Sequence, residues 1–282
     1  MDEKQAQLEW EARVGRLAAF AAWFAAALIV ATFAYRIGGL PRGANNAKQF
    51  LPDVHAHKSA FLLSGVLVGL AMLAFIPPLL YLYRATRFRR PELPAVTKYL
   101  VVAGPVLYLI CSIWLQARYG HAADQFVSGS VKTNKHAEDL IRSATSAPAA
   151  LSLAASIAIG LGTILLSLHA MRAGLLSRFM GVLGVILGAL FVLPLIASPI
   201  IQLFWLLALG ALFTRRWPGG VGPAWETGEP TPWPSGQDRL SAGSGDEPDE
   251  AEDEPQPDPE PEPARAANPR ASRKRKKRKA RG

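Results

Sequence analysis

The sequence predicts an all-α fold: a polytopic membrane helix bundle of six transmembrane helices, followed by a disordered C-terminal tail. Long apolar runs alternate with short charged segments along residues 17–213. The stretch from residue 59 to 83 holds 25 residues without a charged side chain, and such a helix is long enough to cross the ~30 Å hydrocarbon core of a bilayer. The last quarter of the chain is instead rich in proline, glycine and charged residues.

The apolar runs divide the chain into three parts. Residues 1–16 are polar and form a cytoplasmic N-terminal segment, with a short interfacial helix over Trp10, Val14 and Leu17. Residues 17–213 form the six-span membrane domain, and residues 214–282 form the tail. The predicted spans cover residues 17–35, 59–83, 99–116, 148–171, 179–197 and 199–213, and the last two form a helical hairpin.

Small residues recur on the predicted spans at helical spacing. Gly65 and Gly69 lie four residues apart in the second span, and the fifth span carries Gly181, Gly184 and Gly188. Small side chains let helices approach closely in lipid, so we expect these faces to contact partner helices in the membrane. Pro77 and Pro78 predict a kink near the cytoplasmic end of the second span. The two long connections, residues 36–58 and 117–146, are predicted as loops, with a short amphipathic helix in the second half of the latter.

The distribution of cations predicts the orientation. Residues 84–98 carry five Lys/Arg in 15 residues, whereas residues 117–146 carry four in 30. Cytoplasmic segments are enriched in Lys and Arg, so the N- and C-termini are predicted in the cytoplasm. Four cations in residues 36–58 run against this pattern: Arg36, Arg42, Lys48 and Lys58.

The tail has an acidic, proline-rich part and a basic end. Ten carboxylates lie within residues 246–262, and this segment has too few apolar residues to offset the entropy of ordering. Residues 270–281 carry nine cations. The densest block, proposed to bind lipid or another polyanion, consists of Arg273, Lys274, Arg275, Lys276, Lys277, Arg278 and Lys279.

Three interpretations of this basic block remain open. It binds anionic lipid headgroups, it contacts the phosphates of RNA or DNA, or it is a solvated tail whose charge supports the topology. No aromatic residue is interleaved in the block, so base stacking is not supported and specific nucleic-acid recognition is not expected.

The sequence shows no catalytic motif. It contains no His-Glu-x-x-His, no phosphate-binding loop ending in Gly-Lys-Ser/Thr and no cysteine pair for zinc, because Cys111 is the single cysteine. We therefore predict no enzyme activity, no catalytic residues, no metal and no cofactor. The polar side chains predicted inside the membrane, where such groups are costly, include His169 in the fourth span and Gln202 in the sixth.

Three stretches carry a resemblance to known proteins. The residues YLYRATRFRRPEL (81–93) and HAMRAGLLSRFMGVLGVILG (169–188), together with TRRWPGGVGPAWETGEPTPWP (214–234), resemble uncharacterised bacterial six-span integral membrane proteins. The resemblance implies the six-span topology and a bacterial plasma membrane, and it implies no activity and no site residues.

Two functions follow as expectations. The first is a non-enzymatic membrane protein, a scaffold or regulatory subunit, whose tail contacts anionic lipid or a cytoplasmic partner. The alternative is a small-solute transporter or channel, with a groove among spans four to six that includes Gln202 and the Ser/Thr face of span four. An enzyme acting on lipid is a third class.

Overall fold

The computed structural model describes residues 3–41, 45–193, 199–218 and 220–233, and these residues are helical without strands. The predicted all-α class is therefore confirmed. The helices of the described residues are α1 Glu3–Gly38, α2 Ala47–Ala56, α3 Lys58–Leu73, α4 Ile76–Arg89, α5 Val96–Ser128, α6 Asn134–Arg172, α7 Arg178–Val192, α8 Pro199–Phe213 and α9 Ala224–Thr227.

Four helical segments are long and apolar enough to cross a membrane. They are Glu3–Gly38, Lys58–Arg89, Val96–Ser128 and Asn134–Arg172. The remaining apolar helices, α7 and α8, have 15 residues each. At 1.5 Å per residue each rises only about 22 Å, so their length alone does not establish two further spans.

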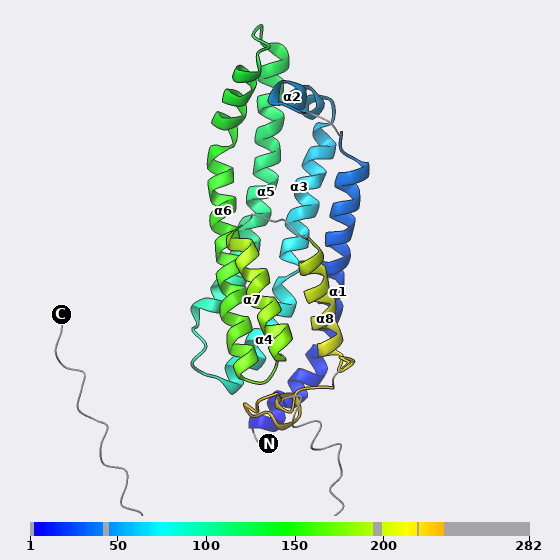
Figure 1. Cartoon of the computed structure of the whole chain (residues 1–282), viewed down its shortest axis with the longest axis vertical. Coiled ribbons are helices and arrows are strands. Elements are labelled where there is room, and N and C mark those ends of the chain that lie inside the picture. Colours follow the sequence, from blue (N-terminus) through cyan, green and yellow to red (C-terminus); the bar gives the residue numbers. More distant parts are fainter. Residues whose placement is uncertain (1–2, 42–44, 194–198, 219, 234–282) are drawn as a thin grey trace, which may run out of the picture. The chain divides into compact units, whose positions relative to one another are not determined.

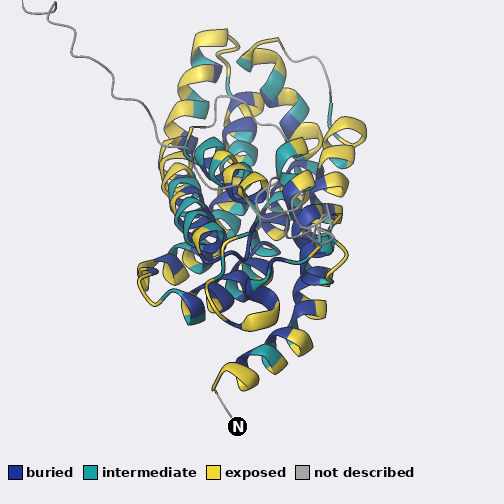
Figure 2. Ribbon diagram, turned by 60° about the horizontal axis from the view of Figure 1, so that its bottom comes forward, coloured by how far each residue is buried: buried dark blue, intermediate teal, exposed yellow. Residues whose placement is uncertain are grey.

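The long helices run side by side, and the short hairpin packs against one half of them. In Figure 1, α1, α3, α5 and α6 extend toward the end that carries α2, whereas α7 and α8 lie beside the half nearer the N-terminus. The main packing pairs are α5 with α6, α6 with α7, α3 with α5, and α1 with α8. Figure 2 shows that the buried residues gather on the inward faces of these helices.

Glycine allows the closest of these helix contacts. A Cβ atom on Gly65 would lie 2.8 Å from the carbonyl oxygen of Ser112, so α3 meets α5 at the predicted small-residue face. On the other side of the bundle, a Cβ on Gly188 of α7 would lie 2.6 Å from the carbonyl oxygen of Gly160 on α6. These backbones approach closely because no side chain separates them.

The predicted second span is interrupted where the prolines predict a kink. Helix α3 ends at Leu73 and α4 begins at Ile76. Pro77 and Pro78 have no N–H, so they cannot bond to the carbonyls four residues earlier, and the helix restarts with proline in its first turn.

Both long connections contain helix, so their prediction as loops was wrong, except that the second half of residues 117–146 is helical as expected. Residues 36–58 include α2, and residues 117–146 are the ends of α5 and α6 apart from a short turn. Helices α5 and α6 have 33 and 39 residues, more than the ~20 that cross a bilayer core, and the polar residues of this connection belong to their ends. A second apolar cluster stabilises this end under α2; its buried members include Leu51, Val54, Phe61, Ala122, Ala123, Phe126 and Ala137.

The start of the tail and the end of the N-terminal segment are also corrected. Residues 3–16 belong to α1, which runs without a break into the first predicted span, so the short helix predicted there is not separate from that span. The tail was expected from residue 214, but the described residues 220–233 include α9 and the buried Trp225. An aromatic residue that can pack against the bundle orders this part of the chain. The acidic and basic blocks lie outside the described residues.

We predict that replacing Gly188 by Ala lowers the free energy of unfolding by about 1–3 kcal/mol, because the added methyl group would meet the Gly160 carbonyl. Reversible unfolding in mixed micelles measures this change. Gly120→Ala is the matched control: its Cβ would have 4.0 Å to the nearest atom, so we expect no loss of stability. Equal stability of the two variants would contradict the close contact between α6 and α7.

Candidate functional site at the N-terminal end of the bundle

A buried ion pair joins α1 to α4 at the end of the bundle that carries the N-terminus. Glu11 is 3% exposed and Arg89, the last residue of α4, is 5% exposed. The guanidinium donates from Nη1 to Oε1 of Glu11 at 2.5 Å and from Nη2 to Oε2 at 3.0 Å. This two-pronged geometry is the strongest form of the Arg–carboxylate pair.

The remaining donors of Arg89 are also bound by the protein itself. Nε and Nη2 donate to the carbonyl oxygen of Ala224 at 3.0 and 2.7 Å, and Nη1 donates to the carbonyl of Ala85 at 3.0 Å. A guanidinium has five N–H donors, and these five bonds account for all of them. Arg89 is therefore a structural residue that fixes residues 220–233 to the bundle, with no donor left for a ligand.

Aromatic rings surround this ion pair. The Tyr81 hydroxyl donates to the Glu11 carbonyl at 3.1 Å, and its ring stacks against Trp10 at 5.4 Å and Trp225 at 5.9 Å between centroids. Trp225 in turn donates from Nε1 to the Leu175 carbonyl at 2.9 Å. The apolar rings exclude water, which strengthens the ion pair and holds the segment around α9 in place.

A second, exposed ion pair joins the N-terminal turn of α1 to the same segment. The Lys4 ammonium bonds to Glu229, and this hydrogen bond lowers the pKa of the Glu229 carboxyl. Both partners are about half exposed, so this contact adds little stability compared with the buried pair.

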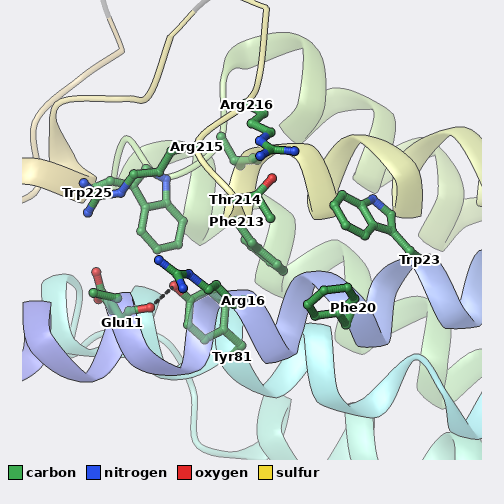
Figure 3. Close-up of a pocket in the computed structure, with 12 residues that line it drawn as sticks. Glu11, Arg16, Phe20, Trp23, Tyr81, Phe213, Thr214, Arg215, Arg216 and Trp225 are labelled. Carbon is green, nitrogen blue, oxygen red and sulfur yellow. Dashed lines mark hydrogen bonds between the residues drawn. The ribbon is translucent and has the colours of Figure 1, made fainter.

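Two basic grooves flank this end of α1. The first, here the α1–α8 groove, has a volume of about 540 Å³ and combines aromatic rings with three arginines, Arg16, Arg215 and Arg216. In Figure 3, Arg16 points toward Tyr81 and Trp225, whereas Arg215 and Arg216 leave the turn after α8 in different directions. Its lining residues are Glu11, Ala12, Arg16, Phe20, Trp23, Tyr81, Leu212, Phe213, Thr214, Arg215, Arg216 and Trp225.

The second groove lies between α1 and α4 and has a volume of about 640 Å³. Three cations, Arg84, Arg87 and Lys98, line it together with Trp10 and Tyr83. The Arg84 guanidinium lies 4.0 Å from the centroid of the Trp10 ring, and Arg87 donates to the Leu93 carbonyl at 2.6 Å. The end of the bundle thus presents cations beside aromatic rings on both sides of α1, a combination typical of a membrane surface.

The residues predicted as polar sites lie apart from these grooves. His169 is half-buried on α6, and its Nδ1 bonds to the carbonyl of Leu165 at 2.8 Å, so it is satisfied by its own helix. Gln202 lines a cavity of about 320 Å³ with Thr32, Tyr108 and Ser156. The basic block Arg273–Lys279 lies outside the described residues.

The structure also locates the histidines of the opposite end. Asp124 on α5 is hydrogen-bonded to Nδ1 of His55 at 2.7 Å and forms an ion pair with Lys58, which holds α2 and the start of α3 against α5. Within the described residues, no group of three or more His, Cys, Asp or Glu side chains could hold a metal ion.

The sequence analysis counted Arg89 among the cations of residues 84–98 that predict the orientation, but it did not identify the Glu11–Arg89 pair. Glu11 lies in a polar segment with mixed charge, and Arg89 is one of four clustered arginines. The 78 residues that separate the partners leave no local pattern that links them. The partly apolar N-terminal helix and the tryptophans after residue 217 were the available signals.

Comparisons of the chain with family models, with curated proteins and with solved structures find no match. The resemblance to bacterial six-span proteins therefore stays a prediction, and the function is argued from the residues alone.

We predict that Glu11→Gln lowers the free energy of unfolding by about 3–5 kcal/mol, because it leaves the Arg89 charge buried without its counterion. Glu9→Gln, an exposed position on the same helix, is the control and is expected to stay near wild type. Unfolding in mixed micelles gives both values. A double replacement, Glu11→Leu with Arg89→Met, should recover much of the loss; equal stability of Glu11→Gln and Glu9→Gln would refute the role of the pair.

Proposed function

We propose that this protein is a non-enzymatic multi-pass membrane protein, a scaffold or regulatory subunit of the bacterial plasma membrane with both termini in the cytoplasm. In this proposal α7 and α8 are the fifth and sixth spans, and the bilayer thins locally around them, as it does for short hydrophobic segments. The basic block Arg273–Lys279 contacts anionic lipid headgroups or a cytoplasmic partner.

One observation carries the scaffold assignment. Among the described residues, the buried charges are those of Glu11 and Arg89, and each is consumed by contacts within the protein. Functional charges in membrane proteins normally face a pathway or a reacting group. A pair enclosed by Tyr81 and Trp225 instead supports a rigid frame that holds its basic end in one arrangement.

The charge at this end supports contact with an anionic surface. Arg16, Arg215 and Arg216 line one groove, and a second cationic set lines the other. Each cation close to an anionic leaflet contributes about 1 kcal/mol of attraction. The seven cations of the basic block would add to the same attraction.

We predict that the full-length protein in neutral nanodiscs recruits vesicles that contain anionic phospholipid, and that 0.5 M salt, about a threefold higher ionic strength than physiological, weakens recruitment. Replacing the seven cations of Arg273–Lys279 by Gln should abolish most of this recruitment, as measured by co-flotation. Neutral vesicles are the control. Equal recruitment of neutral vesicles, or recruitment unaffected by the seven replacements, would contradict lipid contact by the block.

A small-solute transporter or channel is the second candidate, and one cavity favours it. The cavity lined by Gln202 of α8 is also lined by Ser156 of α6, Tyr108 of α5 and Thr32 of α1, so polar groups from four helices gather there. Its other lining residues are mostly apolar, and they include Phe33, Leu187 and Phe191. A transport function requires this cavity to reach water.

If the protein carries solutes, Gln202→Cys should react with a membrane-impermeant thiol reagent in sealed vesicles, because a solute pathway is hydrated. Mass spectrometry of the labelled protein measures the reaction. The native Cys111, which is 1% exposed, is the internal control and should remain unlabelled. An unreactive Gln202→Cys would argue against this candidate and in favour of the scaffold.

A further inference from the structure

The α1–α8 groove contains positive charge that the described part of the protein does not neutralise. None of its three arginines forms a salt bridge with a described side chain. Glu11, the one acidic residue in the lining, is already paired with Arg89. The contrast with Arg89, whose donors are all used, marks Arg16, Arg215 and Arg216 as cations available to a ligand.

The backbone after α8 shows that one of these arginines occupies an unusual position. Among the described residues other than glycine, only Arg215 has a positive φ, at 59°. The Arg215 N–H donates to the Leu212 carbonyl at 2.9 Å and the Arg216 N–H to the Ala211 carbonyl at 2.8 Å, which is the hydrogen-bond pattern of a glycine-type helix cap. An arginine here costs about 1 kcal/mol relative to glycine, so the side chain at this position points to a role beyond capping.

The groove continues onto an apolar surface that faces outward. Phe20, which lines the groove, is 63% exposed, and Phe24 one turn further along α1 is 61% exposed. Leu207 on α8 is also exposed, and Trp23, whose ring contacts that of Phe20, donates weakly to the Leu207 carbonyl at 3.4 Å. A ligand that fits both parts has an anionic head and a long apolar chain.

We propose that the α1–α8 groove binds one anionic phospholipid, with the phosphate of its headgroup at Arg16 and at the arginines of the turn, and with an acyl chain along Phe20 and Phe24. The planar guanidinium matches the geometry of a phosphate, and the rings of Trp23 and Trp225 suit the boundary between headgroup and chain. This proposal rests on the proposed function, since it requires the basic end to lie at a membrane surface.

The site differs from the attraction of a basic tail in stoichiometry and in its dependence on a single residue. A solvated polybasic block binds a surface through many equivalent charges, so one replacement changes little. A groove in which Arg16 binds the phosphate loses a charge-assisted hydrogen bond when that residue is replaced, and such a bond corresponds to about tenfold or more in affinity.

The test uses the full-length protein in a neutral detergent, with phosphatidylglycerol added and the thermal unfolding midpoint measured. We expect a saturable rise in the midpoint that fits one site. Arg16→Gln should weaken the apparent affinity about tenfold or more. Arg13→Gln is the matched control, because Arg13 is exposed on the same helix but does not line the groove. This variant should bind phosphatidylglycerol as the wild type does.

A second variant distinguishes weaker lipid binding from a loss of stability. Arg215→Gly removes a cation and at the same time relieves the positive φ, so the unliganded protein should be at least as stable as wild type while it binds phosphatidylglycerol more weakly. Unchanged affinity in both Arg16→Gln and Arg215→Gly would overturn the proposal.

Two further arms identify the source of the anion. Phosphatidylcholine, which has no net charge, and inorganic phosphate, which has no chain, should both fail to raise the midpoint. If inorganic phosphate raises the midpoint as much as phosphatidylglycerol does, the groove binds a free anion, and the proposal of a lipid site is overturned. A variant in which the seven cations of Arg273–Lys279 are replaced by Gln should still show the rise in the unfolding midpoint with phosphatidylglycerol. If that variant loses the rise while Arg16→Gln keeps it, the basic block binds the lipid, which overturns the groove and leaves the proposed function standing.

Discussion

The ion pair between Glu11 and Arg89 is the interaction on which the N-terminal end of the bundle depends. Two charges are removed from water there, and the desolvation is offset because all five guanidinium donors find acceptors. One of these acceptors, the carbonyl of Ala224, lies in the segment after α8. One arginine therefore connects the first helix, the fourth helix and the chain that follows the last apolar helix.

Elsewhere in the bundle, several helices meet through close backbone contact. Glycine permits this contact, because it places no side chain between the two backbones. Gly160 and Gly188 meet across α6 and α7, and Gly65 lies against Ser112 of α5. The Ser112 hydroxyl also donates to the Gly65 carbonyl at 2.9 Å, which adds a polar contact between two apolar helices. Such contacts tolerate little change in volume.

The charges at the basic end fall into two groups with different consequences. Arg89 is buried and fully bonded, so its role is to hold the structure. Arg16 and Arg216 are exposed at a groove lined by aromatic rings, and they keep donors for a ligand. The buried pair supports the exposed arginines indirectly, because it fixes Trp225 and with it one wall of the groove. Rigid support of this kind lowers the entropy that ligand binding would otherwise cost.

The sequence by itself determined the all-α class, the apolar helices and the glycine faces of α3 and α7, because periodicity and side-chain size act locally along a helix. It also located the kink before Pro77, since proline removes a hydrogen bond wherever it stands. Only the tertiary structure decided the pairing of Glu11 with Arg89, the ordering of Trp225 and the extension of α5 and α6 through a predicted loop. Each of these depends on a partner that is distant in the chain, and the local composition does not indicate which residue that partner is.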